Sequence, residues 1–82
     1  MLNSIFRLPK VMAETGYSRS TIYLRISQGL WPKPISLGPN SIGWASFEVE
    51  QMNACRIAGK SDEEIRMLVR TLEEGRQKPR VS

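Results

Sequence analysis

Apolar residues near the start of the chain recur at the spacing of a short helix. Leu8, Val11 and Met12 follow the i, i+3, i+4 pattern of one buried helix face. Pro9 suits the first turn of that helix, because a backbone N–H at this position has no partner within the helix. The pattern predicts a first helix over residues 9–15.

A second helix follows after a two-residue connection that contains a glycine. Ser18 is a typical N-cap, because its hydroxyl can accept a hydrogen bond from a free N–H group one turn on. Ile22 and Ile26 lie one turn apart and mark the inward face, and Gly29 predicts the end of the helix. Two short helices joined by a tight turn form the helix-turn-helix pattern, although other corners between two helices show the same spacing.

The next segment changes from a helical to an extended pattern. Two prolines, two residues apart within residues 30–34, exclude a helix. Residues 35–37 and residues 42–44 then alternate apolar and polar side chains on either side of a Pro-Asn turn signal. We expect a two-stranded hairpin that packs on the helices, because two strands alone are only marginally stable. Its inward side chains are expected to be Ile35, Leu37, Ile42 and Trp44.

Two further helices are predicted in the second half of the chain. The third begins at Ser46, and its inner positions are Val49, Met52 and either Cys55 or Arg56. The fourth opens with a capping box, in which a serine is followed three residues later by a glutamate, at residues 61–64. A glycine at position 75 predicts its end. Its apolar stripe consists of Ile65, Leu68, Val69 and Leu72.

The apolar stripe of this fourth helix has two interpretations. It either folds back to cover the first three helices or forms the seam of a homodimer, for which so short a helix is only marginally stable by itself. The chain therefore divides into a domain over residues 1–59, an amphipathic helix over residues 60–76 and a flexible basic tail over residues 77–82.

Composition excludes several classes of protein. With 82 residues, the chain forms one small domain with a modest core. It has no histidine and a single cysteine, which removes nearly every zinc site, the His-based catalytic triads and any disulfide within the chain. No carboxylate lies near a nucleophile and a base in a spacing that suggests catalysis. We therefore expect no enzyme, no cofactor and no bound metal.

The net charge of +4 lies in the first third of the chain. Residues 1–33 hold five basic residues and one acidic residue (+4), residues 34–59 hold one and two (−1), and residues 60–82 hold six and five (+1). Such a concentrated positive field suits a polyanion such as nucleic acid. No apolar stretch approaches the roughly 20 residues of a membrane-spanning helix, and the N-terminus shows no signal-peptide pattern. We expect a soluble intracellular protein.

The order helix, tight turn, helix, proline segment, hairpin and helix resembles the AlpA family of prophage regulators, which shares its DNA-binding head with MerR-like proteins and small phage excisionases. The matching text is RLPKVMAETGYSRSTIYLRISQGLWPKPISLGPNSIGW, followed by FEVEQM. The resemblance implies a mainly α fold with a small β-hairpin, a winged helix-turn-helix with an extra C-terminal helix. It further implies a sequence-specific transcriptional regulator of prophage or mobile-element genes that binds double-stranded DNA. Such a protein is expected in the bacterial cytoplasm, associated with the nucleoid through DNA.

The resemblance also assigns the DNA-binding residues. Residues 18–28 form the recognition helix, and its major-groove segment contains Ser18, Arg19, Ser20, Thr21 and Tyr23. Arg25 flanks this segment, Lys33 is the basic residue between the prolines, and Asn40 lies at the wing tip. Asn40 stands where the family often has arginine, so we expect the wing to donate hydrogen bonds without neutralising phosphate charge.

Two basic residues near the first helix, Arg7 and Lys10, are further candidates for phosphate contact. Two other functions fit the same residues. One is an excisionase-type factor that bends DNA and acts with an integrase. The other is a protein-interaction module whose ligand is the amphipathic helix over residues 61–75.

Overall fold

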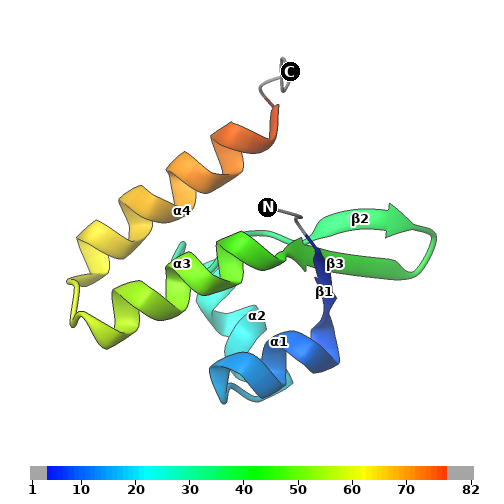
Figure 1. Cartoon of the computed structure of the whole chain (residues 1–82), viewed down its shortest axis with the longest axis horizontal. Helices are drawn as coiled ribbons and strands as arrows, with labels where there is room; N and C mark the ends of the chain where they lie inside the picture. The colour runs from blue at the N-terminus through cyan, green and yellow to red at the C-terminus, as the bar shows by residue number, and fades with distance from the viewer. Residues whose placement is uncertain (1–3, 78–82) are drawn as a thin grey trace.

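The computed structural model describes residues 4–77, which form a mainly helical fold with one small antiparallel sheet. The elements, in chain order, are β1 (Ile5–Arg7), α1 (Leu8–Thr15), α2 (Arg19–Ser27), β2 (Ile35–Gly38), β3 (Ser41–Ala45), α3 (Ser46–Ile57) and α4 (Asp62–Gln77). The hairpin of β2 and β3 projects from the helices as a wing (Figure 1). The prediction of a winged helix-turn-helix with an extra C-terminal helix is confirmed. Most of the predicted basic tail, residues 78–82, lies outside the described residues.

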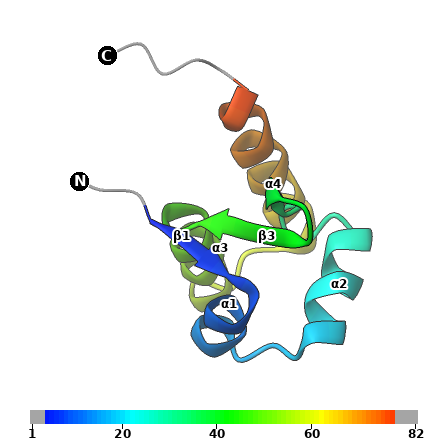
Figure 2. The ribbon, with the colours of Figure 1, turned by 90° about the vertical axis from the view of Figure 1, so that its right-hand side faces the viewer.

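The sheet has a third strand that the sequence pattern did not predict. β1 pairs antiparallel with β3, so the strand order is β1-β3-β2 and Phe6 lies opposite Trp44 (Figure 2). Three residues are too few to show strand alternation, and β1 leads directly into α1. The close approach of the two strands depends on Gly43. A Cβ atom there would lie 2.7 Å from Ile5 Cγ2 and 3.0 Å from the carbonyl oxygen of Phe6.

The hairpin buries fewer side chains than its alternating pattern predicts. Trp44 is fully buried, and Ile35 and Ile42 are half-buried, as expected for inward positions. Leu37 is 41% exposed, so the prediction that it faces inward is wrong. The pairing of β2 with β3 shifts register between Ser36 and Gly38, which interrupts the regular alternation of the strand at Leu37. The tip of the hairpin extends beyond the helices (Figure 1).

The first two helices lie where the sequence predicts them. α1 ends at Gly16, which has a φ of +76° and whose N–H donates to the carbonyl of Met12. Glycine adopts this left-handed conformation without the steric cost that a side chain brings. α2 begins after Ser18 and ends at Ser27, one residue earlier than expected.

α4 runs past the glycine at which the sequence predicts its end. The helix continues through Gly75 to Gln77, so the prediction of a stop at residue 75 is wrong. The side chain of Arg76 explains the extension. Its guanidinium donates to both carboxylate oxygens of Glu48, at 2.6 and 2.8 Å, and to the carbonyl of Lys33 at 2.8 Å. These bonds hold the last turn of α4 against α3 and the proline segment.

The core joins all four helices and the sheet. Trp44 lies at its centre and donates its indole N–H to the carbonyl of Pro32 at 2.8 Å. α4 packs across α3 and contributes three buried side chains of its apolar stripe (Figure 1). Those side chains are only 4–9% exposed, because the helix folds back on the core of its own chain: they are Ile65, Val69 and Leu72. The fourth residue of the proposed seam, Leu68, packs against the same core.

Candidate nucleic-acid interface

α2 lies at one side of the molecule with a broad face open to solvent (Figure 2). Ile22 is fully buried and Ile26 half-buried, and together they fix the inward face of the helix. The side chains on the opposite face are exposed: Ser20, Tyr23, Leu24 and Ser27. The helix therefore presents a mixed polar and apolar surface along its whole length.

The start of α2 is fixed by the predicted N-cap. The Ser18 hydroxyl accepts a hydrogen bond from the Thr21 N–H at 3.2 Å and lies 2.9 Å from the Thr21 hydroxyl. Its distance to the Ser20 hydroxyl is 3.3 Å. The hydroxyls of Ser18 and Thr21 thus take part in capping, whereas Arg19 and Ser20 have exposed side chains at the N-terminal end of the helix.

A groove of about 530 Å³ runs beside α2 and brings together four of the predicted site residues. They come from different segments of the chain: Arg7 precedes α1, Arg19 and Tyr23 belong to α2, and Asn40 lies in the hairpin turn. The Arg19 guanidinium lies 5.9 Å from the centre of the Tyr23 ring, a distance at which a cation and an aromatic face attract each other. The groove therefore combines two cations, an aromatic ring and an amide.

Arg7 is held in place by the sheet. Its Nε donates to the carbonyl of Ile42 at 3.1 Å, which ties the side chain to β3. An arginine has five N–H donors, so the two terminal nitrogens remain available to an anion.

Asn40 serves the hairpin turn as well as the groove. Its φ is +63°, and it is the only non-glycine residue among the described ones with a positive φ. Asparagine tolerates this conformation better than most residues. The turn therefore favours asparagine at this position for a reason that is independent of any ligand.

Two of the predicted phosphate contacts lie outside the groove. Lys10 pairs with Glu14 on α1 at 3.2 Å, and its Nζ lies 5.4 Å from the centre of the Phe6 ring. Lys33 lies beside α4, where its backbone N–H donates to Glu73 at 2.8 Å. Both side chains are exposed, but neither lines the groove that contains Arg19.

Arg25 lies on the other side of α2. Its guanidinium carbon lies 5.2 Å from the centre of the Tyr17 ring. The guanidinium carbon of Arg56 lies 4.3 Å from the centre of the same ring. The sequence analysis did not identify Arg56 as a site residue, since its spacing also fitted the inner stripe of α3. The charge count along the sequence could not show that residues 25 and 56 meet at one ring.

Leu24 is a second residue that the sequence analysis did not select. It is 56% exposed and lies in the middle of the outward face of α2, next to Ser20 and Ser27. A signal was present, because Leu24 follows Ser20 by one helical turn and so occupies the polar face.

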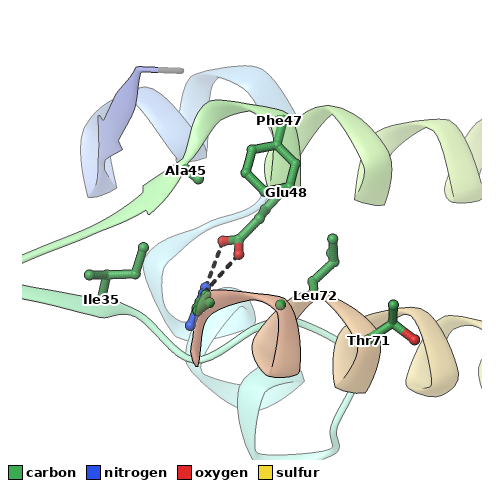
Figure 3. A pocket seen from close by; sticks show the side chains of 8 residues that line it. Ile35, Ala45, Phe47, Glu48, Thr71 and Leu72 are labelled. Atoms are coloured by element: carbon green, nitrogen blue, oxygen red, sulfur yellow. Dashed lines mark hydrogen bonds and ion pairs between the residues drawn. The ribbon is translucent and has the colours of Figure 1, made fainter. Parts of the chain in front are cut away.

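Glu48 illustrates a charged residue with a structural role. Its side chain is 1% exposed, and both carboxylate oxygens accept hydrogen bonds from Arg76 (Figure 3). The pair lies beside a largely apolar pocket of about 280 Å³ between α3, α4 and the sheet. Within residues 4–77, no group of three His, Cys, Asp or Glu side chains is placed to hold a metal ion. No helix in this part of the chain has the length and apolar character needed to cross a membrane.

Comparison with known proteins places these features in a family. Residues 4–57 match the family described as prophage CP4-57 regulatory protein (AlpA). Over 54 residues the chain is 46% identical to the uncharacterized protein ORF88 of Enterobacteria phage P4, an alignment that covers 66% of this chain and 61% of that protein. Over 53 residues it is 36% identical to the DNA-binding transcriptional activator AlpA of Escherichia coli (strain K12), covering 57% of this chain and 76% of the activator.

No solved structure matches the chain. The family match spans β1 to α3, and therefore includes the helix-turn-helix, the wing and the groove between them, whereas α4 lies beyond it. The chain thus belongs to the AlpA family of prophage regulatory proteins.

Proposed function

We propose that this protein is a sequence-specific DNA-binding transcriptional regulator of prophage or mobile-element genes, with α2 as its recognition helix. The observation that carries the proposal is the groove in which Arg7, Arg19, Tyr23 and Asn40 meet. Three segments that are distant in sequence, β1, α2 and the hairpin turn, bring donors and an aromatic ring together along one exposed helix. The name of the Escherichia coli relative, a DNA-binding transcriptional activator, points in the same direction.

The arrangement suits the major groove of B-form DNA. In helix-turn-helix docking, residues near the N-terminal end of the second helix reach the base edges. Arg19 is at this end and can make a bidentate contact with the O6 and N7 atoms of guanine. Ser20 can bond to a base or a phosphate, and the Tyr23 ring can contact a thymine methyl group.

The residues around α2 suit the DNA backbone. Arg7 is tied to β3 and retains free donors, so it can meet a phosphate beside the recognition helix. Asn40 is at the tip of the wing and can donate a hydrogen bond, but it carries no charge. The wing is therefore expected to position the protein on the duplex and to add little to the salt dependence of binding.

Selection of bound sequences from a pool of random duplexes, followed by mobility-shift titrations at several salt concentrations, tests this function. We expect a preferred sequence, and an affinity that falls with salt by about 0.9 logarithmic units per phosphate contacted for each tenfold increase in salt. Absence of duplex binding at low salt, or an affinity that does not change with salt, would contradict the proposal.

Substitution of Arg19 tests the assignment of the recognition helix. Arg19→Ala should lose about 1–3 kcal/mol of discrimination at one or two base pairs, which is the effect of a good bidentate contact. Arg70→Ala is the matched control, because it removes the same charge from an exposed position on α4. If Arg19→Ala weakens the selected and random duplexes equally, Arg19 contacts only phosphate.

A further inference from the structure

A second basic cluster lies across α2 from the groove and surrounds the ring of Tyr17. The ring packs edge-on against the buried Trp31, with 6.0 Å between centroids and an interplanar angle of 85°. Arg25, near the end of α2, and Arg56, near the end of α3, place their guanidinium carbons 5.2 and 4.3 Å from the centre of the Tyr17 ring. Lys60, in the turn between α3 and α4, lines the same pocket of about 270 Å³.

The three cations of this Tyr17 cluster form no ion pair with the described part of the chain. The pocket has no acidic residue in its lining. Within residues 4–77, the two ion pairs are Lys10–Glu14 and Glu48–Arg76, so neither arginine of the cluster is paired with a carboxylate. Glu64 lies close enough to Lys60 for the lysine to help lower its pKa, but the two side chains form no ion pair, and the Glu64 carboxylate accepts its hydrogen bonds from Ser61.

The cluster is also partly fixed before any ligand binds. Arg56 donates to the carbonyl of Thr15 at 2.9 Å, which ties the end of α3 to the end of α1. Stacking on Tyr17 restrains both guanidinium groups. Like charges that converge on one ring repel each other, and an anion that enters between them removes that repulsion. The remaining arginine donors match the oxygens of a phosphate.

We propose that the Tyr17 cluster is a phosphate-binding site that takes a backbone phosphate of the bound DNA, on the strand opposite the one that faces the Arg7–Arg19 groove. This inference rests on the proposed function. Arg19 and Arg25 are six residues apart on α2, which places them about 120° apart around the helix axis, on two different flanks. A helix about 10–12 Å across fills a major groove about 12 Å wide, so its two flanks face different strands.

The overall shape of the protein agrees with this placement. The wing and the turn between α3 and α4, which holds Lys60, lie at opposite ends of the long axis of the molecule, with α2 between them (Figure 1). The protein can therefore hold the duplex on both sides of the recognition helix. Asn40 brings no charge to the wing tip, so phosphate neutralisation depends on the arginines of the groove and on the Tyr17 cluster.

Lys60→Gln is the main test, because the side chain is exposed and makes no hydrogen bond that the fold requires. We expect this variant to bind the selected and random duplexes more weakly by the same factor, and to reduce the salt slope by about one unit. Arg25→Gln should behave in the same way. The matched control is Arg70→Gln, which should leave the slope unchanged. Melting temperatures establish that each variant is folded.

Neutral methylphosphonate linkages, introduced one at a time along both strands of the selected site, locate the contact. The wild-type protein should lose affinity at positions on both strands. Lys60→Gln should become insensitive at positions on one strand only, and Arg7→Gln at positions on the other strand. Sensitive positions confined to one strand, or an unchanged pattern in Lys60→Gln, would overturn the inference while leaving the proposed function intact.

Two further measurements separate the sources of phosphate and the two proposals. Inorganic phosphate is titrated into the wild-type protein and Lys60→Gln, and chemical shifts of the Tyr17 region are followed. Phosphate binding that requires Lys60, with DNA affinity unchanged in the variant, would assign the site to a free anion and overturn the DNA contact. If the wild-type protein binds no duplex, the proposed function itself fails.

Discussion

Several residues beside α2 stabilise the local backbone conformation and also belong to the candidate interface. Ser18 caps the helix, and Asn40 adopts the left-handed conformation of the hairpin turn. Substitution of such a residue changes the local fold and the surface together. Tyr23, Leu24 and Arg19 are better probes, because their side chains are exposed and form no backbone hydrogen bond among those described.

Leu24 is the sharpest of these probes, because an apolar side chain in the middle of the outward face can contact a thymine methyl group. We expect Leu24→Ala to reduce preference for thymine at one position of the selected site. Replacement of that thymine by deoxyuracil, which lacks only the methyl group, should weaken the wild-type protein but not Leu24→Ala. The affinities of both proteins for both duplexes, measured at one salt concentration, give the coupling energy between the Leu24 side chain and the thymine methyl group.

Ser27→Ala is a suitable control for this experiment, because Ser27 lies on the same face of α2. Its hydroxyl already donates a hydrogen bond to the Leu24 carbonyl oxygen at 2.6 Å. This variant should retain the full response to the methyl group. An equal response to the methyl group in the wild-type protein and Leu24→Ala would show that Leu24 does not read it.

At the scale of elements, substitution by alanine should have opposite effects on stability at Gly43 and at Gly75. Gly43→Ala places a methyl group 2.7 Å from a side-chain atom of β1 and 3.0 Å from its backbone, so β1 must shift. Overpacking of this kind costs about 1–3 kcal/mol. Gly75→Ala meets no atom within 4 Å inside α4, and should stabilise the protein by about 0.5–1 kcal/mol.

Urea denaturation of both variants tests this pair. The midpoint should fall for Gly43→Ala and rise for Gly75→Ala. Equal stability of Gly43→Ala and the wild-type protein would mean that β1 does not pack closely on β3.

The start of α4 should respond to pH through its capping box. The Ser61 N–H and hydroxyl both donate to Glu64, and these hydrogen bonds, with the nearby charge of Lys60, hold the pKa of Glu64 below its usual value of 4.5. Because the pKa of Glu64 is lower in the folded protein than in the unfolded chain, its ionised carboxylate stabilises the fold fully at pH values above the unfolded-state pKa. This contribution is lost as the pH falls through the folded value.

Melting temperatures of the wild-type protein and Glu64→Gln, compared from about pH 6 to about pH 3, measure that contribution. The wild-type protein should melt higher at the upper end of the range, and the difference should shrink as the pH falls. A difference that is independent of pH would show that the charge of Glu64 does not contribute.

At the scale of the whole molecule, one ion pair fastens α4 to the winged domain. Arg76 is the partner of the buried Glu48, so Arg76→Met leaves a carboxylate without a counter-charge. Breaking a buried pair costs about 3–5 kcal/mol, and we expect the lower end of that range because the Arg76 side chain is 22% exposed. Replacing both partners should cost much less.

A comparison of Arg76→Met with the double variant Glu48→Met and Arg76→Met tests this role. Chemical denaturation should show a large loss of stability in the single variant and substantial recovery in the double variant. Similar stability of the single variant and the wild-type protein would mean that α4 is held by its apolar stripe alone.

Much of the fold could be predicted from the sequence, because local signals agree with the packed structure. The capping residues Ser18 and Ser61, the glycine that ends α1 and the two prolines before β2 all act within a few residues of their own position. The isoleucines of α2 and the stripe of α4 follow the helical period, so their burial was predictable. The family resemblance implied that the second helix and the wing contain the DNA-binding residues.

Features that depend on residues distant in the sequence were decided only by the tertiary structure. β1 has too few residues for a pattern and exists because Gly43 lets it approach β3. Leu37 follows the buried pattern but lies where the register of β2 on β3 shifts, and its side chain is 41% exposed. The helix continues past Gly75 to Arg76, whose guanidinium binds the Glu48 carboxylate. Glu48 lies 28 residues earlier in the chain, so a local sequence pattern could not show this contact.

The candidate interface divides in the same way. The sequence by itself determined which short segment forms an exposed helix and that positive charge gathers around it, since capping, periodicity and composition are local properties. Only the tertiary structure decided that Arg7, Arg19 and Asn40 meet on one flank of α2, and that Arg25, Arg56 and Lys60 meet on the other. The physical reason is that the side chains on each flank come from separate helices and turns, and their distances are set by how those elements pack.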